Sequence, residues 1–225
     1  MKADFNTKIR NTIERFLNEN ARFITSCNRE EKNSVDNDYS CKIYNEFSLQ
    51  HELGLYLRND KEFENSIILF EKNVKSFADD FASWVKHEID IVIVNKITND
   101  KYAIELKFPL NGQYPEQMFQ FIKDIQFVEQ LKTHARFQAT FCLTLVNDPC
   151  FYSSTGRGNK GLDCDNGVYR YFRNSETIKA EIPPPINHRN RSATSLCLQG
   201  EYSVEWKCLE GNEFIRYYLL EANVD

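Results

Sequence analysis

The apolar positions of this chain recur with two spacings, one typical of helices and one typical of strands. Between residues 4 and 25, apolar side chains return every three or four positions, which predicts an amphipathic helix. The same spacing returns over 47–60, where Ser48 is the expected capping residue, and over 115–132, where Pro115 suits the first turn. We therefore expect three helices, each with one apolar face.

Shorter apolar runs that are rich in β-branched and aromatic residues predict strands. They lie at 63–74, 89–94, 101–107 and 137–146, and a final hairpin over 202–221 is expected to turn near residues 210–212. Because a predicted helix connects the last two single strands, those strands are expected to run parallel through a right-handed crossover. The pattern predicts an α/β fold, a mixed sheet flanked by helices, with an N-terminal helix and a β-rich C-terminal extension.

Two polar stretches divide the chain. Residues 26–40 have no apolar periodicity and are rich in Asn, Asp and Ser, and residues 153–167 contain four glycines. We therefore expect an N-terminal helix with its linker, a core, and a C-terminal extension that packs on that core. The boundaries of these parts are placed at 1–40, 41–155 and 156–225.

Composition narrows the classes of function. A net charge of −5 over 225 residues is not that of a large nucleic-acid platform. No apolar run is long enough to cross a membrane, and no membrane partner is expected. The seven cysteines include no C-x-x-C pair, which argues against a zinc site or a disulfide framework. Reduced thiols in a cytoplasmic protein are the expectation.

Two adjacent predicted strands carry charged residues among isoleucines and valines. If the connection between them is symmetric, Asp90 lies directly opposite Glu105. Like charges so placed are destabilising at a Cβ separation of ~4.5–5.5 Å, and a divalent cation such as Mg²⁺, which prefers oxygen ligands, would offset the repulsion. Lys107 shares a face with Glu105 because it follows by two residues. The other side of the pair is then wholly apolar, with Ile89, Ile91 and Ile93 opposite Leu106, Ile104 and Tyr102.

This strand pair and its flanking helices resemble the PD-(D/E)xK nuclease superfamily, which has the restriction-endonuclease-like fold. The family pattern matches "EID" at 88–90 and "ELK" at 105–107, in the order helix with Glu, strand, Asp-bearing strand, Glu-x-Lys strand and helix. The resemblance covers about residues 45–146 and implies a restriction-endonuclease-like mixed-sheet core. Ile89 stands where the pattern often has Pro, a departure that many members share.

The resemblance also implies roles for individual residues. Asp90 and Glu105, with the main-chain carbonyl of Leu106, are the expected ligands of one or two Mg²⁺ ions, for which Mn²⁺ can substitute. Lys107 is expected to position or deprotonate the attacking water and to stabilise the charge that develops on the phosphate.

Further candidates come from the two helices beside the strand pair. Many members add a glutamate from the preceding helix, for which Glu52 is the expected catalytic residue and Glu46 the alternative. The stretch "QMFQF" resembles a Gln-x-x-x-Tyr element of recombination-type members, with Phe121 in place of Tyr. The candidate substrate-binding glutamines are Gln117 and Gln120, with Gln113 as a further alternative.

The function expected from this resemblance is that of a Mg²⁺-dependent nuclease that hydrolyses phosphodiester bonds, acting on DNA in defence, restriction or repair. Nucleic acid is the expected partner, and a homodimer is compatible with the sequence. The alternative is a catalytically inactive module of the same fold that binds nucleic acid or protein. Loss of an essential carboxylate would favour that alternative, but Asp90, Glu105 and Lys107 are all present.

Overall fold

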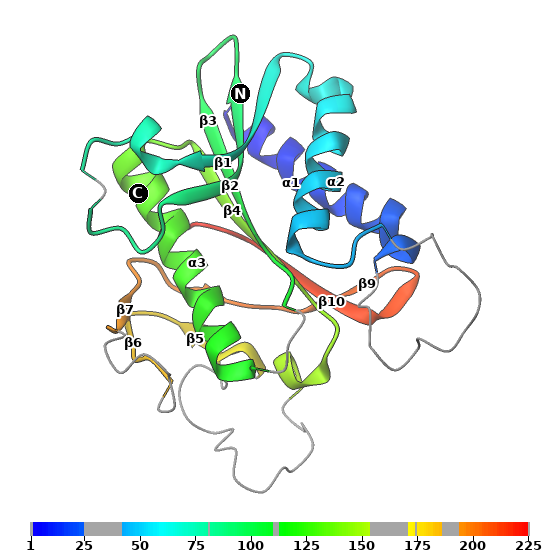
Figure 1. Cartoon of the computed structure of the whole chain (residues 1–225), viewed down its shortest axis with the longest axis vertical. Coiled ribbons are helices and arrows are strands. Elements are labelled where there is room, and N and C mark those ends of the chain that lie inside the picture. The colour runs from blue at the N-terminus through cyan, green and yellow to red at the C-terminus, as the bar shows by residue number, and fades with distance from the viewer. Residues whose placement is uncertain are drawn as a thin grey trace, which may run out of the picture.

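A six-stranded mixed sheet forms the centre of the computed structural model (Figure 1). The strands stand in the order β1-β2-β3-β4-β10-β9, and every neighbouring pair is antiparallel except β3 with β4. Their bounds are β1 (Ser66–Asn73), β2 (Glu88–Asn95), β3 (Lys101–Lys107), β4 (Ala139–Val146), β9 (Lys207–Leu209) and β10 (Asn212–Glu221). The predicted mixed α/β architecture is confirmed, as is the C-terminal hairpin, which turns at Gly211 with a φ of +80°.

The structure describes residues 2–24, 42–80, 82–109, 113–153, 171–173, 175–185 and 194–224. The predicted linker at 26–40 lies outside the described residues, and so does the predicted glycine-rich loop beyond Ser153. Four cysteines in the described ranges are free thiols: Cys142, Cys150, Cys197 and Cys208.

The three predicted helices are confirmed to within a few residues at each end. They are α1 (Lys2–Asn20), which continues into the 3-10 turn η1 (Ala21–Phe23), α2 (Glu46–Asn59) and α3 (Tyr114–Ala135). Pro115 lies in the first turn of α3, as predicted. Short 3-10 turns are η3 (Lys61–Phe63), η4 (Val74–Ser76) and η5 (Pro149–Phe151). Within the described ranges, no helix has the length and apolar character needed to cross a bilayer.

The start of α2 differs from the prediction in a way that matters for the site. The N-cap is Asn45 and not Ser48, because the Asn45 side chain accepts a hydrogen bond from the Ser48 N–H at 2.8 Å. The Ser48 hydroxyl in turn accepts from the Asn45 N–H at 3.0 Å, which completes a capping box. The helix therefore begins earlier than expected and places Glu46 in its first turn.

Helices cover both faces of the sheet. On one face α1 and α2 lie together, and Ile9 and Leu53 share a buried cluster with Ile104 of β3 (Figure 1). On the other face, Phe127 of α3 packs with Val92 of β2. Close approach of α2 to the sheet depends on Gly54, where a Cβ atom would lie 2.1 Å from the Phe70 ring of β1.

The crossover from β3 through α3 to β4 is parallel, as predicted, and its register sets Glu105 beside Cys142. Every residue of β4 is buried, which is typical of a strand covered on both faces. The charged end of β3 therefore lies beside a fully buried strand, and a charge in such surroundings is costly unless it is paired.

The residues after β4 add two small antiparallel ladders on the α3 side of the sheet. They are formed by β5 (Thr177–Ile178) with β8 (Tyr202–Ser203) and by β6 (Glu181–Ile182) with β7 (Leu196–Cys197). Glu129 of α3 holds this part in place, because its buried carboxylate accepts hydrogen bonds from the N–H groups of Gln199 and Gly200 and from the Tyr202 hydroxyl.

Candidate active site

The antiparallel pairing of β2 with β3 ends just before Asp90 on β2 and Glu105 on β3. The predicted register is confirmed from Val94, which pairs with Lys101, to Ile91, which pairs with Ile104. Beyond Ile91 the ladder does not continue, so the predicted backbone pairing of Asp90 with Glu105 is replaced by bonds that their side chains make.

Each of the two carboxylates bonds to the backbone of the opposite strand. Asp90 Oδ2 accepts a hydrogen bond from the Leu106 N–H at 2.7 Å, and Glu105 Oε1 accepts one from the Asp90 N–H at 3.2 Å. The end of the pairing at Ile91 also corrects the prediction of one wholly apolar side. Ile89 packs with Phe127 of α3, whereas Ile91 belongs to the buried cluster on the opposite face of the sheet, under α1 and α2. The two acids still lie on adjacent strands, and the carboxylate of Glu105 bonds to the main chain of Asp90 itself.

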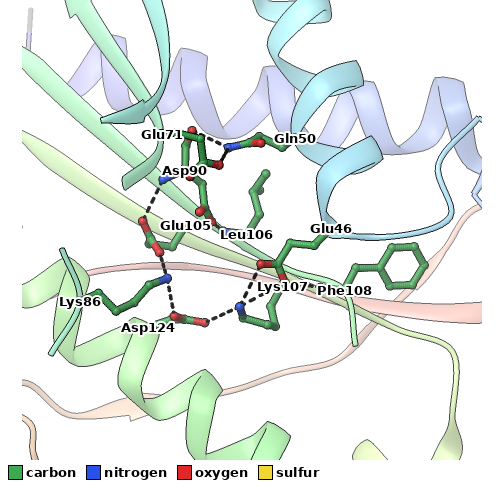
Figure 2. A network of polar contacts seen from close by, with 10 residues as sticks. All are labelled: Glu46, Gln50, Glu71, Lys86, Asp90, Glu105, Leu106, Lys107, Phe108 and Asp124. Carbon is green, nitrogen blue, oxygen red and sulfur yellow. Dashed lines mark hydrogen bonds and ion pairs between the residues drawn. The ribbon is translucent and has the colours of Figure 1, made fainter. Parts of the chain in front are cut away.

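Lys86, in the irregular segment before β2, lies between two buried carboxylates. Its ammonium donates to Glu105 Oε2 and, at 2.9 Å, to Asp124 Oδ1 (Figure 2). Glu105 is 1% exposed and Asp124, from α3, is 4% exposed. The ammonium also lies 5.5 Å from the centre of the Phe127 ring, and the Lys86 side chain is 22% exposed.

Lys107 extends the same network from the end of β3. Its ammonium lies 3.1 Å from a carboxylate oxygen of Glu46 and 3.7 Å from Asp124 Oδ2. Glu46 also accepts a hydrogen bond from the Phe108 N–H at 3.4 Å. Acids and lysines thus alternate along a continuous chain of contacts from Glu105 to Glu46, which Figure 2 shows.

The main chain at Asp90 is held from the α2 side of the sheet by Gln50. The buried Gln50 amide donates to the Asp90 carbonyl at 2.8 Å and to a carboxylate oxygen of Glu71. Glu71 lies in β1 with a φ of +47°, a left-handed conformation that is unusual for a residue with a side chain. The amide therefore links the Asp90 main chain to β1, and it fixes the position of the backbone that carries the Asp90 carboxylate.

Burial and unbalanced charge shift the pKa values of the network. Burial raises the pKa of Asp90 to about 7, although Lys86 and the Leu106 N–H lower it. Burial, and then the charge of Asp90, raises the pKa of Glu105 well above its ordinary value. For both Lys86 and Lys107, burial lowers the pKa, but Asp124 and the other facing carboxylates more than offset it, so the pKa is raised. Burial is thus the main cause of the raised pKa values of Asp90 and Glu105, while the raised pKa values of both lysines keep them protonated.

Of the two glutamates considered on α2, the structure brings Glu46 into the network. Glu52 lies instead beside His51, with 3.4 Å between the carboxylate and the imidazole, and its side chain is 31% exposed. The two positions are six residues apart on the helix, so they point in different directions. The geometry favours Glu46 as the helix carboxylate of the site.

The candidate glutamines lie near the start of α3. Gln117 and Gln120 are half-buried and precede Asp124 by seven and four residues, which places all three on one stripe of the helix. Gln113 is exposed and precedes the helix. Phe121 is fully buried against the ring of Phe172, so the aromatic residue of "QMFQF" belongs to the core.

Two members of the network, Lys86 and Asp124, were not among the residues singled out in the sequence. Asp124 does carry a signal, because it falls on the apolar stripe of α3 between Phe121 and Val128, where a charged residue is out of place. Lys86 carries none, since it lies in a segment without periodicity and its partners are 19 and 38 residues away.

The network offers oxygen ligands of the kind that Mg²⁺ prefers. When fully ionised, the carboxylates of Glu46, Asp90, Glu105 and Asp124 exceed the two lysine ammoniums by two negative charges. Asp124 Oδ2 is buried and accepts no hydrogen bond from the described residues. In the conformation described, however, no three Asp, Glu, His or Cys side chains of the described ranges converge closely enough to hold a metal ion. The donor chemistry fits a divalent cation, but in this conformation the Lys86 ammonium lies between the carboxylates of Glu105 and Asp124.

Searches against protein-family models, curated proteins and solved structures gave no match for this chain. The class is therefore defined by the fold and the site alone: a mixed α/β protein with a buried network of acids and lysines at the ends of two central strands.

Proposed function

We propose that the protein is a Mg²⁺-dependent nuclease that hydrolyses phosphodiester bonds, with a restriction-endonuclease-like core and DNA as its expected substrate. The observation that carries this proposal is the meeting of Asp90, Glu105 and Lys107, from two adjacent strands, in one network with Glu46. Paired carboxylates beside a lysine at a strand end are the groups that metal-assisted attack on a phosphate needs.

In this proposal Asp90 and Glu105, with the main-chain carbonyl of Leu106, hold the cation. A bound Mg²⁺ supplies polarisation of the scissile phosphate and a more acidic water. Gln117 and Gln120, on the same side of α3 as Asp124, are proposed to contact the nucleic-acid backbone. Defence, restriction and repair are the settings in which such an enzyme is expected to act.

Lys107 is proposed to act as a cation and not as a base. Its pKa is raised by Asp124 and Glu46 despite burial, so the amine keeps its proton at neutral pH. A protonated lysine can orient the attacking water and stabilise the negative charge that develops on the phosphate. Glu46 positions that ammonium through the 3.1 Å ion pair.

One observation favours the alternative of a catalytically inactive binding module. Asp90, Glu105 and Glu46 are each already engaged by a backbone N–H group or a lysine. Networks of this kind also occur as purely structural features, and they shift pKa values in the same way. An enzyme and a binding module therefore have to be separated by an assay.

The test is incubation of the purified protein with supercoiled plasmid, linear duplex DNA, single-stranded DNA and RNA, each with Mg²⁺, Mn²⁺ or EDTA. A nuclease should cut at least one substrate with metal and none in EDTA, and a Glu105→Gln preparation should not cut. Cleavage that persists in EDTA, or in the Glu105→Gln protein, would come from another activity. Binding without cleavage under every condition would support the inactive module.

A further inference from the structure

Asp124 and Glu129 are both buried acids of α3, but their surroundings differ. Glu129 receives neutral donors at both oxygens, from the N–H groups of Gln199 and Gly200 and from the Tyr202 hydroxyl. Among the described residues, Asp124 Oδ1 accepts a hydrogen bond from the Lys86 ammonium alone, and Asp124 Oδ2 accepts none. The contact nearest to Oδ2 that the structure gives is the Lys107 ammonium at 3.7 Å, which is too long for a hydrogen bond, and a carboxylate that is 4% exposed is costly when one oxygen accepts no hydrogen bond.

The Lys86 ammonium lies between the carboxylates of Glu105 and Asp124. It bonds to Glu105 Oε2 and lies 2.9 Å from Asp124 Oδ1, and these two residues come from elements on either side of it, β3 and α3. A single positive charge therefore sits where two carboxylates converge, and a third, Asp90, bonds to the same strand end. Lys86 itself comes from an irregular segment, which can shift more easily than the strand or the helix.

We propose that Lys86 is an internal counter-cation that a divalent metal displaces, and that Asp124 then joins Asp90 and Glu105 as a metal ligand. This inference rests on the proposed function, because it concerns the cation of the same site. Exchange of one ammonium for a divalent ion removes one of the two excess negative charges of the network. It also gives Asp124 Oδ2, which accepts no hydrogen bond from the described residues, a closer partner than the Lys107 ammonium at 3.7 Å.

The first test measures Mn²⁺ binding by calorimetry and thermal melting, without any nucleic acid. Lys86→Met keeps the length of the side chain and removes the ammonium that competes with the metal. Without metal, the buried carboxylates of Glu105 and Asp124 then lack this cation, so the variant should melt at a lower temperature than wild type. The same variant should bind Mn²⁺ at least about tenfold more tightly, a difference of about 1.4 kcal/mol. Lys101→Met is the matched control, because Lys101 is a lysine of β3 whose ammonium bonds to the Ala135 carbonyl outside the network. Its Mn²⁺ affinity should equal that of wild type.

The second variant tests the new ligand. Asp124→Asn should weaken Mn²⁺ binding by about tenfold or more, both alone and combined with Lys86→Met. Unchanged or weaker binding in Lys86→Met, or unchanged binding in Asp124→Asn, would overturn the proposal. Absence of Mn²⁺ binding in both wild type and Lys86→Met would overturn it as well.

A measurement on the wild-type chain avoids any dependence on how a variant folds. Acetylation of lysines, read by mass spectrometry, should increase at Lys86 when Mg²⁺ or Mn²⁺ is added, because the displaced ammonium reaches solvent. Lys101 should be labelled equally with and without metal. Metal binding that leaves the labelling of Lys86 unchanged would show that the ammonium is not displaced.

These outcomes separate the inference from the proposed function. A wild-type protein that binds Mn²⁺ and cuts nucleic acid, with Lys86→Met binding no more tightly, refutes only the role of Lys86. Displacement of Lys86 by metal in a protein that never cuts supports the metal site and refutes the nuclease.

Discussion

Lys107 at the end of β3 and Glu46 in the first turn of α2 form a 3.1 Å ion pair across 61 residues of sequence. The pair exists because the Asn45 capping box starts the helix early enough to include Glu46. It brings a helix carboxylate to the strand that carries the Glu-x-Lys pattern, and it defines which α2 glutamate belongs to the site.

The two glutamates of α2 give a matched comparison. Glu46→Ala removes the partner of the Lys107 ammonium and should lower metal-dependent cleavage about 10- to 100-fold, as is usual for residues that support a metal site. Glu52→Ala should leave the rate close to wild type, since Glu52 contacts His51. Initial rates on the preferred substrate measure both, and equal losses in the two variants would argue against the assignment of Glu46.

Lys107→Ala should reduce cleavage about 10²–10³-fold, because it removes a positive charge that acts on the developing negative charge of the phosphate. Nucleic-acid binding, measured by fluorescence anisotropy, should change far less, since other contacts hold the substrate. If binding and cleavage fall in parallel, Lys107 serves to bind the substrate and has no separate role in the chemical step.

The stability of the metal-free protein should fall as the pH rises from about 4 to about 7. Burial raises the pKa of Asp90 from 3.8 to about 7, so in this range the folded chain holds a proton that the unfolded chain has lost. The free energy of unfolding changes with pH in proportion to the protons bound by the unfolded state minus those bound by the native state. That difference is negative here, so the free energy of unfolding falls by up to about 1.4 kcal/mol per pH unit. Urea unfolding in EDTA at several pH values measures the slope.

Asp90→Asn provides the control for this dependence. The variant carries no titrating group at residue 90, so its stability should decline less between pH 4 and 7 than that of wild type. A slope that Asp90→Asn leaves unchanged would assign the pH dependence to other groups, Glu105 first among them, since its pKa is also raised.

Gln50→Ala should destabilise the fold by about 1–3 kcal/mol, because it leaves the Asp90 carbonyl without the amide donor that lies at 2.8 Å. His51→Ala, at the exposed neighbouring position, should change stability by less than about 0.5 kcal/mol. Denaturant midpoints of the two variants make the comparison. Equal, small effects would mean that the Asp90 backbone does not depend on Gln50.

Much of the fold follows from local patterns of apolar and polar residues in the sequence. Apolar spacing located α1, α2 and α3, and β-branched runs located the strands, because these preferences act over a few residues. The register of β2 with β3 also follows, since a one-residue slip would turn Ile91 and Ile104 away from the helices that cover them. Membership of the PD-(D/E)xK superfamily remains a prediction from the same residues.

The sequence by itself therefore determined the elements, the mixed α/β class, and the placing of Asp90, Glu105 and Lys107 on adjacent strands. Tertiary structure decided which distant groups those residues meet. Asp124 is 19 residues from Glu105, Glu46 is 61 residues from Lys107, and Lys86 comes from a segment without a pattern. Their positions depend on how α2 and α3 dock on opposite faces of the sheet, and docking is the sum of many weak contacts between side chains far apart in sequence. Only packing could put a lysine ammonium at the point where a metal is expected.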